Sequence, residues 1–274
     1  MKFAMCNEFC EGWTFAAVCE LAADAGYHGL EIAPFTISDS VEDVGPGLRR
    51  RLRQTAARHG LEIAGLHWLL AKPEGLNLNS PDAASRARTV NYLKAEVDFC
   101  RDVGGRIMVL GSPKQRSVPA GQAYEEVWAR TVQLLKDLAL HAAARGVCIC
   151  VEPLGSRETN FICTAAEGRR LVKAVGHTSF RMVLDVKAMC TEEETIPDII
   201  CKSSPYLRHF HANDANRQGP GFGDTDFAPI AAALREVGYE GYVSVEVFDI
   251  SAGPERIARE CLRYLKEVFA WTAP

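Results

Sequence analysis

The sequence has no long apolar run and no excess of positive charge. None of its apolar stretches reaches the roughly 18 residues of a membrane-spanning helix. Asn7 and Glu8 follow the short apolar segment Phe3–Cys6 at once, which argues against an export signal. Lys and Arg number 31 against 35 Asp and Glu, so no basic excess is available to bind nucleic acid, although a small anionic substrate is allowed. We therefore expect a cytoplasmic protein without a nucleic-acid or membrane partner.

Cysteine is plentiful, but the usual cysteine motifs are absent. The ten cysteines include no pair with the C-x-x-C spacing of a zinc or redox site. Several lie in apolar surroundings, as in the segment Val147–Val151. A chain of this length forms its own large core and does not need a disulfide framework. We interpret the cysteines as reduced, buried thiols that act as small hydrophobic residues.

The sequence also lacks a phosphate-binding fingerprint and a linker. No G-x-G-x-x-G motif follows the first expected strand, which argues against a Rossmann domain. The glycine-rich segment Gly219–Gly223 follows the seventh expected strand and opens no immediate helix. No low-complexity stretch divides the chain, so we predict one domain over residues 1–274.

Short apolar runs alternate eight times with longer segments of helical periodicity. Eight such units in 274 residues are typical of a single (β/α)8 TIM barrel, an α/β fold of roughly 250 residues. The expected strands are Phe3–Cys6, Gly29–Ile32, Glu62–Leu66, Arg106–Leu110, Val147–Val151, Arg181–Leu184, Leu207–His211 and Tyr242–Glu246. The expected helices are Thr14–Ala25, Gly47–His59, Pro81–Val103, Ala120–Ala144, Thr164–Val175, Ile196–Lys202, Phe227–Val237 and Pro254–Phe269.

Four consecutive expected strands end in a side chain that can bind a metal ion. They are Glu152, Asp185, His211 and Glu246. The active site of a parallel barrel lies at the carboxyl ends of its strands, so we expect these four side chains to meet. Any one of them alone could be a solvated loop residue or a helix cap. Three carboxylates brought together without a cation would repel one another, so the set as a whole predicts a divalent metal site.

The donor set narrows the choice of metal. Three carboxylates and one imidazole suit Mg²⁺ or Mn²⁺, and Mn²⁺ accepts the imidazole more readily. The set does not match the Cys and His ligands of a tetrahedral zinc site.

The same residues carry a resemblance to a known family. The run Glu152-Pro153-Leu154, with Glu158, Asp185, His211 and Glu246, resembles the xylose-isomerase-like TIM barrel superfamily of sugar phosphate isomerases and epimerases. Within it the chain is most similar to the D-tagatose/D-psicose 3-epimerases, with hydroxypyruvate isomerase and inosose dehydratase as relatives. The resemblance covers essentially the whole chain.

This resemblance implies a metal-dependent sugar isomerase or epimerase that acts through an enediolate on a ketose or related keto-sugar. It implies one divalent ion, Mn²⁺ first and Mg²⁺ or Co²⁺ as alternatives, held by Glu152, Asp185, His211 and Glu246. It makes Glu152 and Glu246 the catalytic acid–base pair, and it gives Asp185 and His211 no part in proton transfer. Relatives are often dimers or tetramers, so we expect a homo-oligomer.

Further pocket residues follow by position. The resemblance places Glu158 near the substrate hydroxyls and Arg217 at a substrate oxygen, although each could be a solvated loop residue. His67 and Trp68 end the third expected strand and are candidates to bind the sugar, while core packing also explains Trp68. His209 points to the same side of its strand as His211, either as a partner of the site or as filling of the barrel.

The chain departs from the epimerase pattern at one position. The resemblance implies a histidine three residues after Asp185 that helps polarise the substrate carbonyl, and this sequence has Ala188 there. Lys187 could supply the missing donor or could be solvated. The segment after the fourth strand carries Lys114 and Arg116, which could bind an acidic or phosphorylated group or could lie in an exposed loop.

Other functions stay open. A metal-dependent lyase or dehydratase on a keto-cyclitol or 3-keto-sugar, or hydroxypyruvate isomerase, would use the same ligands. A DNA-repair endonuclease of the superfamily uses three metals and extra histidines, which Ala188 and the stretch 111–113 do not supply. A non-enzymatic barrel would not need four intact ligands.

Overall fold

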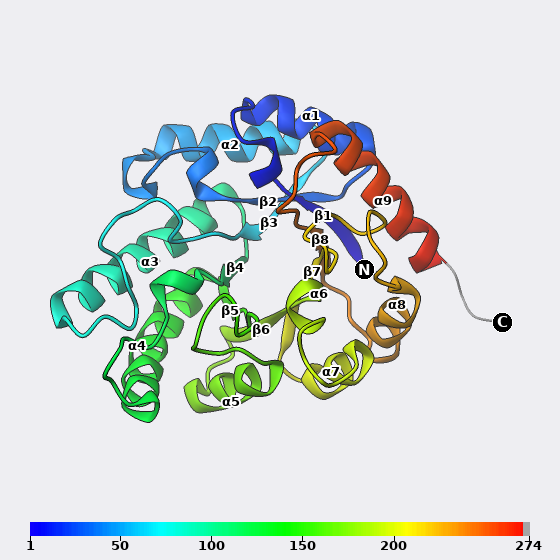
Figure 1. The fold of residues 1–274 in the computed structure, drawn as a ribbon. Helices are drawn as coiled ribbons and strands as arrows, with labels where there is room; N and C mark the ends of the chain where they lie inside the picture. The colour runs from blue at the N-terminus through cyan, green and yellow to red at the C-terminus, as the bar shows by residue number, and fades with distance from the viewer. Residues whose placement is uncertain (271–274) are drawn as a thin grey trace.

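Eight short, mostly buried segments form a closed barrel of parallel strands in sequence order (Figure 1). The structure is a computed structural model and describes residues 1–270; the last four residues of the predicted domain lie outside this range. The predicted TIM barrel is confirmed. The strands are β1 (Lys2–Cys6), β2 (Gly29–Ile32), β3 (Glu62–Leu66), β4 (Ile107–Leu110), β5 (Cys148–Val151), β6 (Phe180–Asp185), β7 (Leu207–Ala212) and β8 (Tyr242–Val245).

An outer ring of α-helices surrounds the barrel (Figure 1). The eight principal helices correspond to the eight predicted ones. They are α1 (Phe15–Ala25), α2 (Pro46–Arg58), α3 (Ala83–Val103), α4 (Tyr124–Arg145), α5 (Ala165–Val175), α7 (Ile196–Ser203), α8 (Phe227–Glu236) and α9 (Pro254–Ala270). The helix α4 begins four residues later than predicted. The short helix α6 (Val186–Met189), directly after β6, was not predicted.

Local sequence signals set the helix ends. Thr14 caps the start of α1, because its side chain accepts a hydrogen bond from the Ala17 backbone N–H. Gly26 ends α1 in the left-handed conformation, at φ 94°, which a residue without Cβ adopts without strain. Asp82 caps α3 in the same way as Thr14, through the N–H groups of Ala84 and Ser85.

The main hydrophobic core fills the layer between the strands and the helices. A smaller apolar cluster of Ile107, Val109, Cys150 and Val183 comes from β4, β5 and β6. Ionisable side chains are buried on two other strands, Glu31 on β2 and His209 on β7. Burial of charge is costly without partners, so these residues mark a built polar network.

The cysteines only partly follow the expectation of burial. All ten are free thiols, and six are buried. Cys190 and Cys201 are exposed, so the interpretation as buried thiols is wrong for these two. Cys190 directly follows α6 and Cys201 lies in α7, and both face solvent.

None of the helices described over residues 1–270 combines the length and the apolar character needed to cross a membrane.

One buried acid of the helix layer gives a test of the packing. Glu96 on α3 is 0% exposed, and neither carboxyl oxygen has a hydrogen-bond partner among the described residues. Burial raises the pKa of Glu96 well above its ordinary value of 4.5, so the folded protein holds it protonated. In the unfolded chain, Glu96 ionises above about pH 4.5, whereas in the folded protein it stays protonated. The wild-type protein therefore loses stability as the pH rises, compared with a variant that carries a neutral side chain at position 96.

We predict that Glu96→Gln leaves the free energy of unfolding nearly unchanged at pH 4 and raises it by about 1–3 kcal/mol at pH 7. Urea denaturation at both pH values measures this difference, with the exposed Glu236→Gln as control. An equal effect of Glu96→Gln at the two pH values would contradict a protonated Glu96.

Candidate active site

The register of the last strands brings the four predicted ligands to one end of the barrel. Asp185 pairs with His211 across β6 and β7. The Glu246 backbone N–H donates to the Ala212 carbonyl at 3.2 Å, one residue beyond β8. Glu152 continues β5 in the same way, through its N–H to the Leu110 carbonyl at 3.2 Å. These backbone bonds fix the starting points of all four side chains.

The four side chains form one buried cluster. One ligand atom from each of Glu152, Asp185, His211 and Glu246 lies within 4.8 Å of the others, and all four residues are buried. The Nδ1 atom of His211 lies 3.3 Å from Glu152 Oε1 and 3.2 Å from Glu246 Oε2. Four potential donors at this spacing could hold one divalent cation.

Asp185 also caps the short helix α6. Its Oδ1 accepts the Ala188 backbone N–H at 2.7 Å, and its Oδ2 accepts the side-chain amide of Asn213. The same amide lies 3.4 Å from Glu246 Oε2. A helix cap and a ligand position thus coincide in Asp185, and α6 holds the carboxylate in place.

Crowding of negative charge perturbs the cluster. Burial, followed by the charges of Glu152 and Glu246, raises the pKa of Asp185 to about 7. Burial lowers the pKa of His211, but Glu31 and Glu246 outweigh it and leave this pKa well above its ordinary value. The cluster therefore draws a positive charge into its centre, which a protonated imidazole or a metal ion can supply.

The orientation of the His211 ring indicates whether a protonated imidazole or a metal ion supplies this positive charge. Its Nε2 lies 3.0 Å from Oε1 of Glu31, a fully buried carboxylate on β2. The opposite ring atom, Nδ1, is buried without a hydrogen-bond partner among the described residues, and the carboxylates around it are acceptors. A ring that donates through one nitrogen to a carboxylate and leaves the other free is the usual arrangement of a metal-binding histidine. The residues present therefore fit a divalent metal ion.

Glu31 belongs to a longer network inside the barrel. Its Oε2 lies 2.6 Å from His209 Nε2, and His67 Nδ1 lies 3.8 Å from its Oε1. Burial raises the pKa of Glu31, but the two histidines of β7 outweigh burial and leave it well below its ordinary value. The Nε2 of His67 contacts Glu8 Oε2 at 2.9 Å. His209 is thus both a filler of the barrel and a partner of the site, and His67 directs Nε2 to Glu8.

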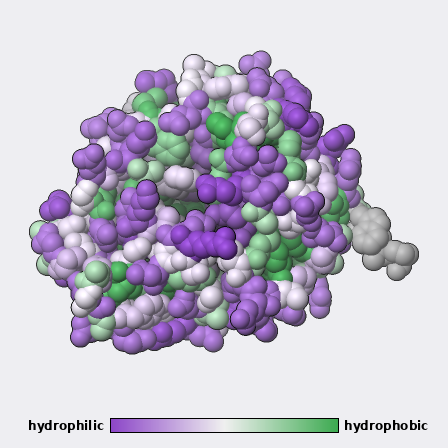
Figure 2. All heavy atoms as spheres, in the orientation of Figure 1, coloured by the Kyte–Doolittle hydropathy of each residue, from purple (hydrophilic) through white to green (hydrophobic). Residues whose placement is uncertain are grey.

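A cavity of about 300 Å³ opens onto three of the four predicted ligands, Glu152, Asp185 and Glu246, while His211 lies buried behind them. Figure 2, which shares the orientation of Figure 1, shows a hollow near the centre of the molecule with hydrophilic side chains around it. All predicted sugar-binding residues line the cavity: His67, Trp68, Glu158 and Arg217. Its size is at the lower end of the range for small-molecule sites.

Three of the lining residues, Trp68, Ser112 and Arg217, have a positive φ, and two of them carry large side chains. Trp68 has φ of 55° and Arg217 φ of 74°, in the left-handed region that large side chains avoid. Trp68 is 41% exposed, so core packing does not explain it, and its indole N–H donates to Glu246 Oε1 at 3.2 Å. The Arg217 guanidinium lies 5.6 Å from the centre of the Phe248 ring. In this backbone conformation, the side chains of Trp68 and Arg217 line the cavity.

Lys187 lines the cavity and is the neighbour in sequence of Ala188, the position at which the resemblance implies a histidine. Its Nζ contacts Glu158 Oε1 at 2.6 Å and lies 4.3 Å over the Phe248 ring. The Lys187 side chain is only 11% exposed, so it is not a solvated lysine. Ala188 is buried and contributes only backbone to the site.

The two cations after β4 separate in the structure. Lys114 lines the cavity, whereas Arg116 is buried and donates to the carbonyls of Leu110 and Ile162 at 3.1 and 3.5 Å. Burial lowers the pKa of Arg116 to about 10. Arg116 thus stabilises the loop backbone, and both expectations for it, a ligand contact and an exposed loop residue, are wrong.

Sequence reasoning missed Glu31, Glu8 and Asn213. Glu31 had a visible signal, because it is a carboxylate within the apolar strand Gly29–Ile32. Asn213 follows His211 by two residues and therefore faces the same side of the chain. Gly111 was missed as well: a Cβ on it would lie 2.2 Å from Glu152 Oε2, so only glycine leaves room for that carboxylate.

Comparison with known proteins identifies the family of the chain. Residues 19–268 match the family model described as xylose isomerase-like TIM barrel. The chain is 31% identical over 247 residues to D-psicose 3-epimerase of Agrobacterium fabrum, covering 87% of the chain and 81% of that protein. It is 29% identical over 237 residues to L-ribulose 3-epimerase of Mesorhizobium japonicum, covering 85% and 76%.

Among solved structures, the fold is similar to that of D-psicose 3-epimerase with D-tagatose from Clostridium cellulolyticum H10. The TM-score is 0.85 at 24% sequence identity, over 98% of this chain and 99% of that one. At this identity the likeness establishes the fold.

Proposed function

Because the chain belongs to the xylose isomerase-like TIM barrel family, we propose that it is a divalent-metal-dependent ketose 3-epimerase. The broader class, an isomerase that acts on carbohydrates, follows from its sugar-epimerase relatives. The observation that carries the proposal is the buried cluster of Glu152, Asp185, His211 and Glu246, with His211 Nδ1 free and facing two carboxylates.

The four residues of the cluster would hold the ion, Mn²⁺ first and Mg²⁺ or Co²⁺ as alternatives. When bound, such an ion supplies Lewis-acid stabilisation of the negative charge that develops on a carbonyl oxygen. We assign the proton transfers to Glu152 and Glu246. They come from β5 and β8, with β6 and β7 between them, so the two carboxylates enter the site from different sides. Epimerisation needs two such groups, because the proton leaves one face of the carbon and returns to the other.

The remaining cavity residues bind and orient the sugar. Glu158 and Arg217 offer hydrogen bonds to hydroxyl oxygens, and Trp68 offers an aromatic face at the cavity rim. We assign to Lys187 the part of the histidine that Ala188 replaces, because its ammonium group is nearly buried and borders the cavity. Phe248 and Glu158 fix that group, so it can donate to a substrate oxygen without a large loss of side-chain entropy.

The proposal is tested by proton NMR in D₂O with Mn²⁺-loaded enzyme. The panel holds ketoses and their phosphates, hydroxypyruvate, keto-cyclitols and 3-keto-sugars. We expect deuterium at C3 of a ketose together with its C3 epimer. Deuterium uptake followed by loss of water would instead establish a lyase, and an aldose product would establish an aldose–ketose isomerase.

We predict that Glu246→Gln abolishes solvent exchange at C3 and lowers kcat by about 10²–10⁴-fold, because an amide cannot accept the proton. Bound metal is measured in the same sample, so that metal loss is separated from loss of the base. Glu267→Gln on the exposed face of α9 is the matched control. Exchange at the wild-type rate in metal-loaded Glu246→Gln would remove this residue from proton transfer.

The role of Lys187 is tested by Lys187→Met, which keeps a long unbranched side chain and removes the ammonium donor. We expect kcat/KM to fall by about 10²-fold, since a lost donor at a developing charge costs about this much. Lys114→Met, at the rim of the same cavity, should change kcat/KM by less than about threefold. Equal effects of the two substitutions would show that Lys187 acts only through the overall charge of the cavity.

Protonation of Asp185 and His211 competes with the metal. Burial and the neighbouring carboxylates raise the pKa of Asp185 to about 7, and the carboxylates raise that of His211. Mn²⁺ affinity should therefore rise by about tenfold per pH unit for each proton released as the pH increases from 5 to 7. Isothermal titration calorimetry in two buffers of different ionisation enthalpy measures the released protons. Affinity that does not change with pH would contradict this site.

A further inference from the structure

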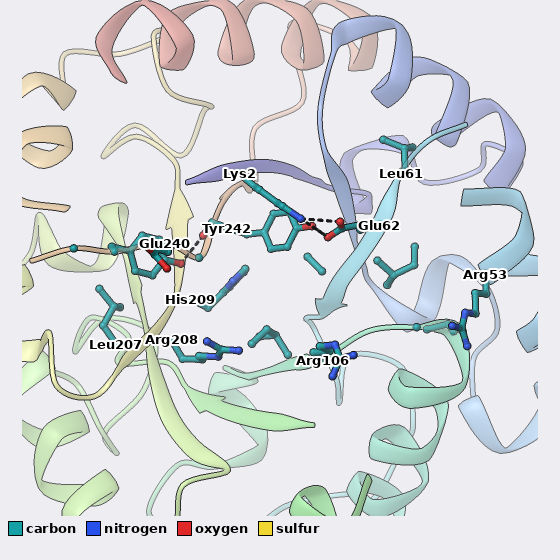
Figure 3. A pocket seen from close by; sticks show the side chains of 18 of the residues that line it. Lys2, Arg53, Leu61, Glu62, Arg106, Leu207, Arg208, His209, Glu240 and Tyr242 are labelled. Atoms are coloured by element: carbon teal, nitrogen blue, oxygen red, sulfur yellow. Dashed lines mark hydrogen bonds and ion pairs between the residues drawn. The ribbon is translucent and has the colours of Figure 1, made fainter. Parts of the chain in front are cut away.

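The opposite end of the barrel carries a second, larger cavity that the proposed reaction does not use. It measures about 830 Å³ and lies at the amino-terminal ends of β1, β3, β4, β7 and β8. Figure 3 shows its opening, with Arg106, Arg208 and Arg53 on its walls and the ring of His209 near its centre. This size is within the range of small-molecule sites.

Positive charge is in excess around this cavity. Its charged lining residues are Lys2, Arg53, Arg106, Arg208, Glu62 and Glu240, with His209 in addition. Lys2 and Glu62 form an ion pair at 2.7 Å and cancel one another. The guanidinium groups of Arg53, Arg106 and Arg208 have no ion-pair partner among residues 1–270. This is unexpected in a chain of net charge −4.

The surroundings strengthen the positive field. Arg53 also lines an adjoining cavity of about 320 Å³. The charged residues that line the 320 Å³ cavity are one acid, Asp102, and five arginines: Arg49, Arg50, Arg53, Arg101 and Arg145. Arg49 and Arg145 pair with Asp102 at 3.1 and 3.2 Å, so the excess charge comes from Arg50, Arg53 and Arg101. Like charges at such a mouth repel one another, and an anion bound between them relieves the repulsion.

The inner part of the 830 Å³ cavity is suited to a less polar group. Leu61, Ile63 and Ile107 line it and are at most 7% exposed. The rings of Tyr239 and Tyr242 border the same space. A ligand with an anionic group at the arginines and a ring or carbon skeleton against these residues would use both parts.

From this arrangement we propose that the amino-terminal end of the barrel binds a small phosphate ester. The planar guanidinium groups of Arg106 and Arg208 recognise the phosphate, for which their fork of donors has the right geometry. The site is separate from the catalytic end and does not depend on the proposed ketose chemistry. Two classes of small molecule, sugar phosphates and nucleotides, carry the phosphate monoester that this site would bind.

The experiment titrates Mg²⁺-saturated protein by isothermal calorimetry with three probes: inorganic phosphate, fructose 6-phosphate and AMP. Saturating D-fructose is present throughout to occupy the catalytic cavity. We expect 1:1 binding of at least one ester, tighter than that of inorganic phosphate and weakened by added NaCl. The ester that binds more tightly identifies the source of the ligand.

The double variant Arg106→Gln/Arg208→Gln should weaken ester binding by at least about tenfold, since two charge-assisted contacts are lost. The control Arg88→Gln/Arg259→Gln removes the same charge from exposed positions outside the cavity and should leave the affinity unchanged. Arg106→Lys/Arg208→Lys keeps the charge without the fork and should bind with intermediate affinity. Absence of saturable binding, or equal affinity of the wild type and the glutamine variant, would overturn the proposal.

Discussion

A buried carboxylate that spans the barrel determines the candidate site. Glu31 on β2 reaches across to β7, where its two oxygens contact Nε2 of His209 and Nε2 of His211 at 2.6 and 3.0 Å. This bridge turns the other face of the His211 ring, with Nδ1, toward Glu152 and Glu246. Burial of a carboxylate is costly unless its oxygens are paired, and His209 and His211 provide that pairing for Glu31. The site therefore depends on the interior of the barrel as much as on its rim.

The two ends of the barrel differ in charge, and the fold favours that difference. Helices of the outer ring follow the carboxyl ends of the strands, and the amino terminus of α6 lies at Asp185, whose Oδ1 accepts the Ala188 backbone N–H. The carboxyl termini of the ring helices lie near the other end, where Arg106 and Arg208 are placed. The acids thus gather at one mouth of the barrel and, at the other, the arginines that have no ion-pair partner among the described residues.

The sequence was sufficient to predict the barrel and the meeting of the four ligands, because the period of the strands and their polar ends are local properties. It did not predict the partners of those ligands. Glu31 and His211 lie 180 positions apart, and only closure of the barrel brings them together. Arg116 shows a second limit: a charged residue in a polar loop turned out to be buried on backbone carbonyls. The strained conformations of Trp68 and Arg217 likewise have no signal in the residue types.

We propose that His211, oriented by Glu31, completes a metal site with three carboxylates. Anomalous diffraction from Mn²⁺-soaked crystals tests it most directly. We expect one peak within bonding distance of His211 Nδ1 and of the carboxylates of Glu152, Asp185 and Glu246. A map with no peak among these side chains, or with the ion on Nε2 of His211 instead, would contradict it.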